Sequence, residues 1–77
     1  MPVFYFDIDE GSGVQQDSEG YEMKLEDVRA EAVKTLSHIA SEIDPESGGH
    51  DLSAVVRDDA GKLIFEATLS LKARWLN

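Results

Sequence analysis

The sequence predicts an α+β fold in which one long amphipathic helix packs on one face of a small, mostly antiparallel sheet. Three observations support this: apolar residues alternate with period two near both ends, they recur with helical spacing in the middle, and glycine-containing turns separate the segments. The order is strand, strand, helix, strand, strand, and a helix on one sheet face suits that order. A chain of 77 residues is expected to form a single domain, residues 1–77, with a small core.

Two strands are expected in the N-terminal third. Residues 3–9 are rich in aromatic and branched side chains with a period of two, which is typical of a strand. The alternation divides them between two faces, with Phe4, Phe6 and Ile8 on one and Val3, Tyr5 and Asp7 on the other. A turn with two glycines follows, residues 14–17 are expected to return as a short strand, and residues 21–23 are expected to continue that edge.

The clearest signal is a helix over residues 25–43. Its apolar positions lie three or four residues apart, at Leu25, Val28, Ala32, Leu36, Ile39 and Ile43. Val33 and Ala40 widen this stripe. Pro45 is expected to stop the helix, because proline disfavours helical geometry in the residue before it. Lys24 stands where a capping Ser or Asp would be preferred, so the start of the helix is poorly capped.

The C-terminal part of the chain predicts a hairpin. Residues 52–58 and 62–71 read as strands, and residues 59–61 form a three-residue loop with Gly61 in the left-handed position. The register of such a loop pairs Asp58 with Lys62, Val56 with Ile64 and Val55 with Phe65. The alternation in the last strand directs toward the core Leu63, Phe65, Ala67, Leu69 and Leu71.

Composition and charge exclude several classes of protein. Seven basic and sixteen acidic residues give a net charge of −9, which disfavours nucleic-acid and anionic-membrane partners. The chain has no cysteine, so disulfide scaffolds, cysteine-ligated metals and thiol catalysis are excluded. There is neither an apolar run long enough for a transmembrane span nor a signal-peptide pattern, and a cytoplasmic protein is expected.

Four acidic residues in the N-terminal third are the candidate metal ligands, namely Asp7, Asp9, Asp17 and Glu19. Calcium prefers several oxygen ligands on one tight loop. The calcium-loop pattern is incomplete here, because strand residues interrupt it and no glutamate closes it. Solvated turn acids are therefore the favoured interpretation, and a cation-binding loop is the alternative.

Catalytic constellations are incomplete as well. His50 precedes Asp51, but the nearby hydroxyls of Ser47 and Ser53 lack the sequence context of a serine nucleophile. The glycines do not form a dinucleotide or phosphate-binding fingerprint. We expect no enzymatic activity and no cofactor.

An apolar cluster is expected on the sheet face that the helix leaves open. The predicted strand faces place Val3, Tyr5, Val56 and Ile64 there. Such a cluster is large for a domain of this size to leave in water. It is expected to be covered either by the C-terminal tail, which carries Trp75, or by a second copy in a two-fold homodimer.

Several segments together resemble a known family. They are residues 5–8 (Tyr-Phe-Asp-Ile), 17–20 (Asp-Ser-Glu-Gly), 29–32 (Arg-Ala-Glu-Ala) and 56–61 (Val-Arg-Asp-Asp-Ala-Gly). In this order they resemble a family of very short bacterial proteins known as domain of unknown function 6894. The resemblance implies a small, stand-alone bacterial cytosolic domain and carries over no catalytic residues. The chain departs from the family pattern at Lys24, which replaces an acidic helix cap.

A more distant likeness is to HicB-like antitoxin domains, carried by a short strand pair, the Gly20-Tyr21 step and a helix rich in Glu and Ala. That likeness implies a small basic protein partner, which the negative charge would suit. The proline-and-glycine segment expected before the helix is absent. The leading hypothesis is therefore a non-enzymatic interaction module that self-associates. The alternatives are an antitoxin-like or decoy protein that binds a basic partner, and a cation-binding loop.

Overall fold

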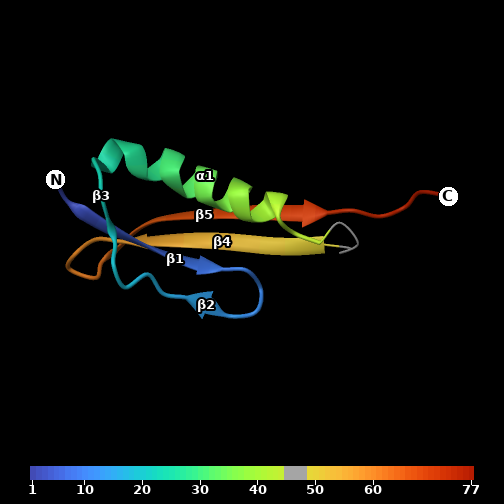
Figure 1. Cartoon of the computed structure of the whole chain (residues 1–77), viewed down its shortest axis with the longest axis horizontal. Helices are drawn as coiled ribbons and strands as arrows, with labels where there is room; N and C mark the ends of the chain where they lie inside the picture. Colours follow the sequence, from blue (N-terminus) through green and yellow to red (C-terminus); the bar gives the residue numbers. More distant parts are fainter. Residues whose placement is uncertain (45–48) are drawn as a thin grey trace.

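In the computed structural model, which describes residues 1–44 and 49–77, one α-helix covers one face of a five-stranded antiparallel sheet (Figure 1). The elements are β1 (Val3–Asp9), β2 (Val14–Gln15), β3 (Tyr21–Glu22), the 3₁₀ turn η1 (Leu25–Asp27), α1 (Val28–Ser41), β4 (Gly49–Arg57) and β5 (Leu63–Lys72). This confirms the predicted α+β class. Residues 14–15 and 21–22, the weaker strand predictions, both pair with β1.

The strand order is β2-β1-β4-β5, and all pairings are antiparallel. β2 pairs with the C-terminal end of β1, at Ile8 and Asp9, whereas β3 pairs with its N-terminal end, at Val3 and Phe4. One long edge of the sheet is therefore occupied by two short strands. β5 forms the opposite edge (Figure 1).

The core lies between α1 and the helix-facing side of the sheet, where α1 packs on β4 and β5. Its buried apolar residues are Phe4, Phe6, Val28, Ala32, Leu36, Leu52, Ala54 and Val56. Half-buried apolar side chains of β5 pack against this cluster, namely Ile64, Phe65, Ala67 and Leu69. The predicted helix-facing set of β1 is confirmed, since Phe4 and Phe6 are buried and Ile8 packs on the core.

The helix is shorter than the predicted span of residues 25–43. Leu25 begins a 3₁₀ turn rather than the α-helix and its side chain is exposed. The poor cap explains this start, because Lys24 makes no side-chain capping bond and only its carbonyl accepts from the Asp27 N–H, at 3.0 Å. Val33, predicted to widen the buried stripe, is 51% exposed. The predicted stop at Pro45 lies outside the described residues.

The hairpin loop forms as predicted, but the register beyond it differs by one residue. Gly61 has a φ of 83°, and the Asp58 N–H donates to the Lys62 carbonyl at 2.9 Å. A bulge between Val56 and Arg57 then shifts the ladder, so that Val56 pairs with Phe65 instead of Ile64.

The shift reverses the predicted faces of β4. Val56 is fully buried against the helix, so its predicted place on the open sheet face is wrong. Ile64 packs against the core instead of joining an exposed cluster. At the ends of β5, Leu63 and Leu71 are exposed although the alternation directed them inward. Across the described residues, no helix has both the length and the apolar character that crossing a membrane requires.

Candidate functional site

A carboxylate fastens the turn between β2 and β3 onto β1. Asp17 Oδ2 accepts the backbone N–H of Phe6 at 3.2 Å, and Asp17 Oδ1 accepts those of Glu19 at 3.0 Å and Gly20 at 3.1 Å. Phe6 lies in the stretch of β1 between the residues that pair with β3 and those that pair with β2. The Asp17 side chain thus takes the place of a neighbouring strand at this point of the edge.

Asp7 and Arg57 form an ion pair beneath this turn. Arg57 Nε donates to Asp7 Oδ2 at 2.7 Å and its Nη2 to Asp7 Oδ1 at 3.1 Å, which is the bidentate geometry typical of strong carboxylate–guanidinium pairs. The same Nη2 donates to the Asp17 carbonyl at 2.9 Å, and the Asp17 N–H donates to Asp7 Oδ1 at 3.0 Å. The network thereby joins β1, β4 and the turn between β2 and β3, through Asp7, Arg57 and Asp17.

The hydrogen bonds of this network favour the charged carboxylates. The Arg57 guanidinium lowers the pKa of Asp7; burial opposes this and the Asp17 N–H assists it. Burial acts to raise the pKa of Asp17, but the N–H groups of Gly20, Phe6 and Glu19 outweigh it, so this pKa is also lowered. Both groups are anions at neutral pH, and both have structural partners.

The four acidic residues predicted as candidate metal ligands do not gather around one point. Asp7 and Asp17 are engaged in the network, Asp9 Oδ1 accepts the Gly11 N–H at 2.8 Å, and Glu19 is exposed. Within residues 1–44 and 49–77, no three His, Cys, Asp or Glu side chains are placed to hold a metal ion together. The structure therefore gives the cation-binding alternative no support.

The open sheet face does not carry the predicted apolar cluster. Arg57 lies over the Tyr5 ring, 5.0 Å from its centre, and the turn at Gly20 packs against Val3 and Tyr5. A Cβ added at Gly20 would approach Val3 Cγ1 to 2.6 Å, so the glycine allows this close contact. Val56 is buried in the core instead. Val3 and Tyr5 remain on this face, where both are half-buried.

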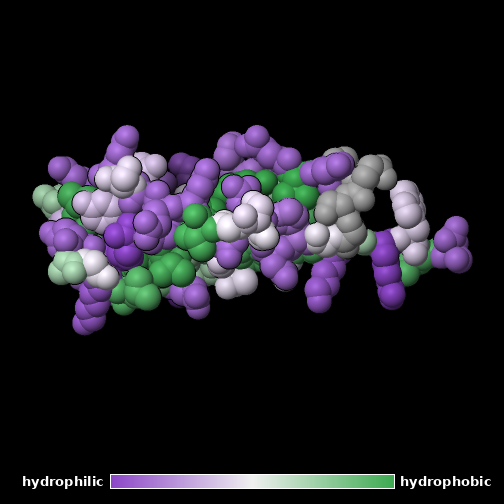
Figure 2. All heavy atoms as spheres, turned by 90° about the horizontal axis from the view of Figure 1, so that it is seen from below, coloured by the Kyte–Doolittle hydropathy of each residue, from purple (hydrophilic) through white to green (hydrophobic). Residues whose placement is uncertain are grey.

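The C-terminal tail does not cover the sheet either. It extends beyond the end of β5, away from the strands (Figure 1), and Trp75 is 91% exposed. On the side that carries β2, hydrophilic residues dominate the surface and hydrophobic ones appear in separate groups (Figure 2). The predicted covering of the open sheet face by the tail at Trp75 is therefore wrong.

The two histidines are held in local contacts. His38 Nε2 lies 2.9 Å from Oε1 of Glu42, which follows the last residue of α1 and is four positions along the chain. His50, at the start of β4, has Nε2 2.7 Å from the Glu10 carbonyl oxygen, so the ring ties the β1–β2 turn to β4 when that nitrogen carries the proton. Ser47, one of the hydroxyls considered near His50, lies outside the described residues.

β5 presents an open strand edge. In the described part of the chain it pairs with β4 alone, over its whole length. Apolar side chains border this edge: Phe65, Ala67 and Leu69 are only half-buried, and Leu71 is 41% exposed. The edge is thus both unpaired among the described strands and flanked by incompletely covered apolar surface.

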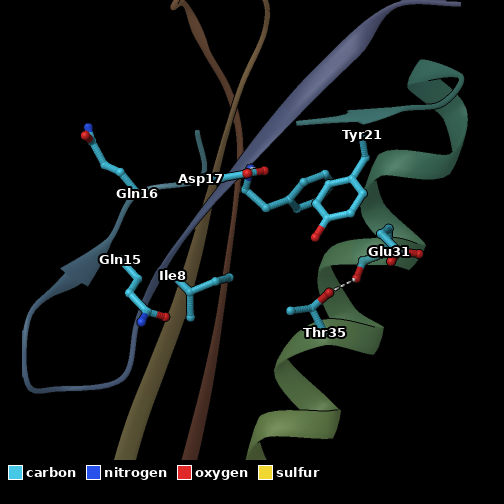
Figure 3. Close-up of a pocket in the computed structure, with 8 residues that line it drawn as sticks. Ile8, Gln15, Gln16, Asp17, Tyr21, Glu31 and Thr35 are labelled. Carbon is cyan, nitrogen blue, oxygen red and sulfur yellow. Dashed lines mark hydrogen bonds between the residues drawn. The ribbon is translucent and has the colours of Figure 1, made fainter. Parts of the chain in front are cut away.

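A groove runs between α1 and the short strands on the β1 edge (Figure 3). Its volume is about 350 Å³, and Phe6 and Ile8 of β1 form its floor. Tyr21 reaches into it from β3, and its ring packs edge-on against Phe6 at 5.9 Å between centres. Glu31 and Thr35 line the α1 side, where the Thr35 hydroxyl donates to the Glu31 carbonyl at 2.9 Å.

Sequence reasoning missed both the open β5 edge and this groove. The edge depends on the strand order, which alternation within a strand does not specify. The groove depends on where α1 lies over the sheet, and the only local signal was an aromatic residue, Tyr21, just after a turn glycine. Neither feature is carried by a motif.

Comparison with known proteins gives one match. A family model described as a domain of unknown function (DUF6894) matches residues 3–70, from the start of β1 to within β5. No curated protein and no solved structure matches the chain.

Proposed function

The chain belongs to the family of the domain of unknown function DUF6894, and we propose that it is a non-enzymatic protein-interaction module that self-associates by pairing β5 with β5 of a second copy. The observation that carries this proposal is the contrast between the two edges of the sheet. One edge is covered by short strands and a hydrogen-bonding carboxylate, whereas the other is a ten-residue strand with an open side.

Unpaired strand edges favour pairing with another chain, and monomeric proteins usually protect them with proline, charged residues or short edge strands. β5 has ten residues, no proline, and Glu66 and Lys72 as its only charged residues. At about 3.4 Å per residue, its edge offers roughly 34 Å of backbone for intermolecular hydrogen bonds. By contrast, Phe6 on the opposite edge already donates its N–H to Asp17.

Exposed apolar surface next to the β5 edge also favours pairing with a second copy. Glu31 and Thr35 line the groove on the β1 side of α1, so helical periodicity places Val33 and Ala40 on the flank toward β5. Val33 is 51% exposed. A two-fold pairing of β5 strands would bring two such flanks together over a continuous sheet and would bury Val33 with Leu69 and its neighbours.

Charge favours this edge over the rest of the surface. Two copies with a net charge of −9 repel each other at long range. Residues 62–74, however, contain Lys62, Lys72 and Arg74 and a single acid, Glu66, so this segment has a net charge of +2. Self-association through the least acidic segment of the chain minimises the repulsion.

The test is the oligomeric state measured by light scattering during size-exclusion chromatography, over a range of concentrations. We expect the unmodified chain to form a dimer. Thr68→Lys places a like charge on both edges of the pair and is expected to give a monomer, because edge lysines oppose strand pairing. Ser12→Lys, at an exposed position in the turn between β1 and β2 on the opposite edge of the sheet, changes the net charge equally and is expected to leave the dimer intact.

A monomer at every concentration up to about 1 mM would overturn the proposal, since a 1 mM dissociation constant corresponds to only about 4 kcal/mol. Equal dissociation of both lysine variants would also overturn it, because net charge rather than the β5 edge would then decide association. Circular dichroism checks that the variants are folded. If Thr68→Lys unfolds the chain, Leu71→Lys makes the same test at a partly exposed position.

A further inference from the structure

We infer that the groove between α1 and the β1 edge binds an arginine side chain from a basic segment of a protein partner. The inference rests on the shape of the groove, on its aromatic wall and on a half-buried carboxylate without a partner. The groove lies on the side of α1 away from β5, so its occupancy is independent of self-association through that strand.

The size and lining of the groove suit one long side chain. Its volume of about 350 Å³ is at the small end of the range for ligand sites, which is about 300–1,000 Å³. Phe6 and Ile8 offer an apolar floor for the methylene groups of the side chain. Tyr21, 58% exposed, leans over this floor and presents a ring face to an entering group (Figure 3).

Glu31 supplies the charge that a cation requires. Its side chain is half-buried on the α1 side of the groove, yet its carboxylate has neither a hydrogen bond nor an ion pair within residues 1–44 and 49–77. An entering cation could therefore pair with this carboxylate without displacing another group of the described chain. Asp17 is the other acid that lines the groove among the described residues, and its oxygens are already occupied.

No basic group of the described residues pairs with the Glu31 carboxylate. Among the residues that the structure describes, no Lys or Arg lines the groove, and Arg57 is bound to Asp7 on the other face of the sheet. Lys34, three residues along α1, lines a neighbouring hollow together with Tyr21 and Glu31, but in the described part of the chain it makes no ion pair with Glu31. With a net charge of −9, the chain as a whole also attracts a basic partner.

Arginine fits these features better than lysine. A planar guanidinium can stack on the Tyr21 ring and present two N–H donors to a carboxylate at the same time. The side-chain carbonyl of Gln15, which also lines the groove beside Ile8, can accept a remaining N–H group (Figure 3). An ammonium group has no planar face and would use only part of this arrangement.

The test is an NMR titration of the full chain with N-acetyl-arginine amide, followed through backbone amide shifts. N-acetyl-citrulline amide is the neutral control, because its urea group has the shape of a guanidinium without the charge. We expect saturable shifts at Ile8, Tyr21 and Thr35 with the arginine compound and none with citrulline. We expect Glu31→Gln to weaken binding by about fivefold or more, as the loss of one partly buried ion pair would.

The matched control is Glu26→Gln, which removes an equal charge from an exposed position outside the groove. It is expected to change the affinity less than twofold. Equal weakening by the two variants, shifts spread over all acidic surfaces, or equal binding of citrulline would each overturn the inference. A chain that is monomeric but still binds arginine in the groove would contradict only the β5 pairing, so the two proposals fail separately.

Discussion

Replacing Asp17 by asparagine tests how the β1 edge is closed. The carboxylate of Asp17 accepts three backbone N–H groups, from Phe6, Glu19 and Gly20, at 3.0–3.2 Å. Asparagine has nearly the same shape but only one acceptor oxygen, and its amide nitrogen donates. Depending on how the side chain is turned, either the Phe6 N–H or both the Glu19 and Gly20 N–H groups would then face another donor.

The structure indicates the size of the effect. A hydrogen bond to a charged group contributes about 1.5–3 kcal/mol to stability. We therefore expect Asp17→Asn to lower the free energy of unfolding by about 2 kcal/mol, measured by urea denaturation. In a domain of 60–100 residues, 1 kcal/mol shifts the midpoint of thermal unfolding by about 4–8 °C, so the midpoint should fall by roughly 8–16 °C.

The effect of pH provides a second check. The folded-state pKa of Asp17 is lowered from 3.8, so its carboxylate stabilises the fold above that value, and the stabilisation is lost as the pH falls through the lowered pKa. The difference between Asp17→Asn and the unmodified chain should therefore be constant from neutral pH to about pH 5 and should shrink in more acidic solution. Glu19→Gln, an exposed acid in the same turn, is the control. Equal effects of the two substitutions, or a difference that grows in acid, would refute the reasoning.

Three further predictions concern single positions and use the same denaturation assay. Gly20→Ala should destabilise the fold by about 1–2 kcal/mol or more, because φ is 75° and the new Cβ would overlap Val3; an unchanged midpoint would contradict the close packing of the turn. Asp7→Asn should lower the free energy of unfolding by about 1–3 kcal/mol, since Arg57 would lose half of a bidentate pair. An unchanged free energy of unfolding would mean that Asp17 alone holds the turn on β1. Val56→Thr should lower the free energy of unfolding by about 1–3 kcal/mol, whereas Val55→Thr should leave it nearly unchanged. The opposite result would contradict the bulge and support the register in which Val55 faces the helix.

The parts of the fold that follow from local patterns were predictable. Alternation assigned Phe4 and Phe6 to the core, helical spacing assigned Val28, Ala32 and Leu36, and turn chemistry assigned Gly61. Each of these signals is read within a few residues of the chain, where sterics and periodicity act directly.

The β4 faces were wrong because one inserted residue in a ladder reverses every side chain beyond it. The bulge at Val56 and Arg57 leaves no mark in the alternation of β4 itself. The inserted residue is Ile64 of β5, so Phe65 pairs with Val56, which packs under α1. Normal alternation turns Arg57 to the opposite face, where it reaches Asp7.

The candidate site was less accessible from the sequence. The sequence indicates Asp7 and Asp17 only as acidic residues near glycines, whereas the contacts that join them to the sheet are between positions 10–50 residues apart in the chain. These long-range hydrogen bonds show that two of the candidate metal ligands instead hold the turn between β2 and β3 against β1. Of the expected interface residues, Trp75 is exposed, while Val3 and Tyr5 are half-buried under the turn at Gly20.

The most direct measurement of β5 pairing is an isotope-filtered NMR experiment on a mixture of labelled and unlabelled chains, which detects only contacts between different copies. Edge-to-edge pairing predicts intermolecular contacts between backbone protons of residues 63–72 in an antiparallel pattern, together with contacts between the Val33 methyl groups and the partner copy. Intermolecular contacts confined to β1 or to the tail at Trp75, or none in a sample that is dimeric by light scattering, would contradict the pairing of β5 strands.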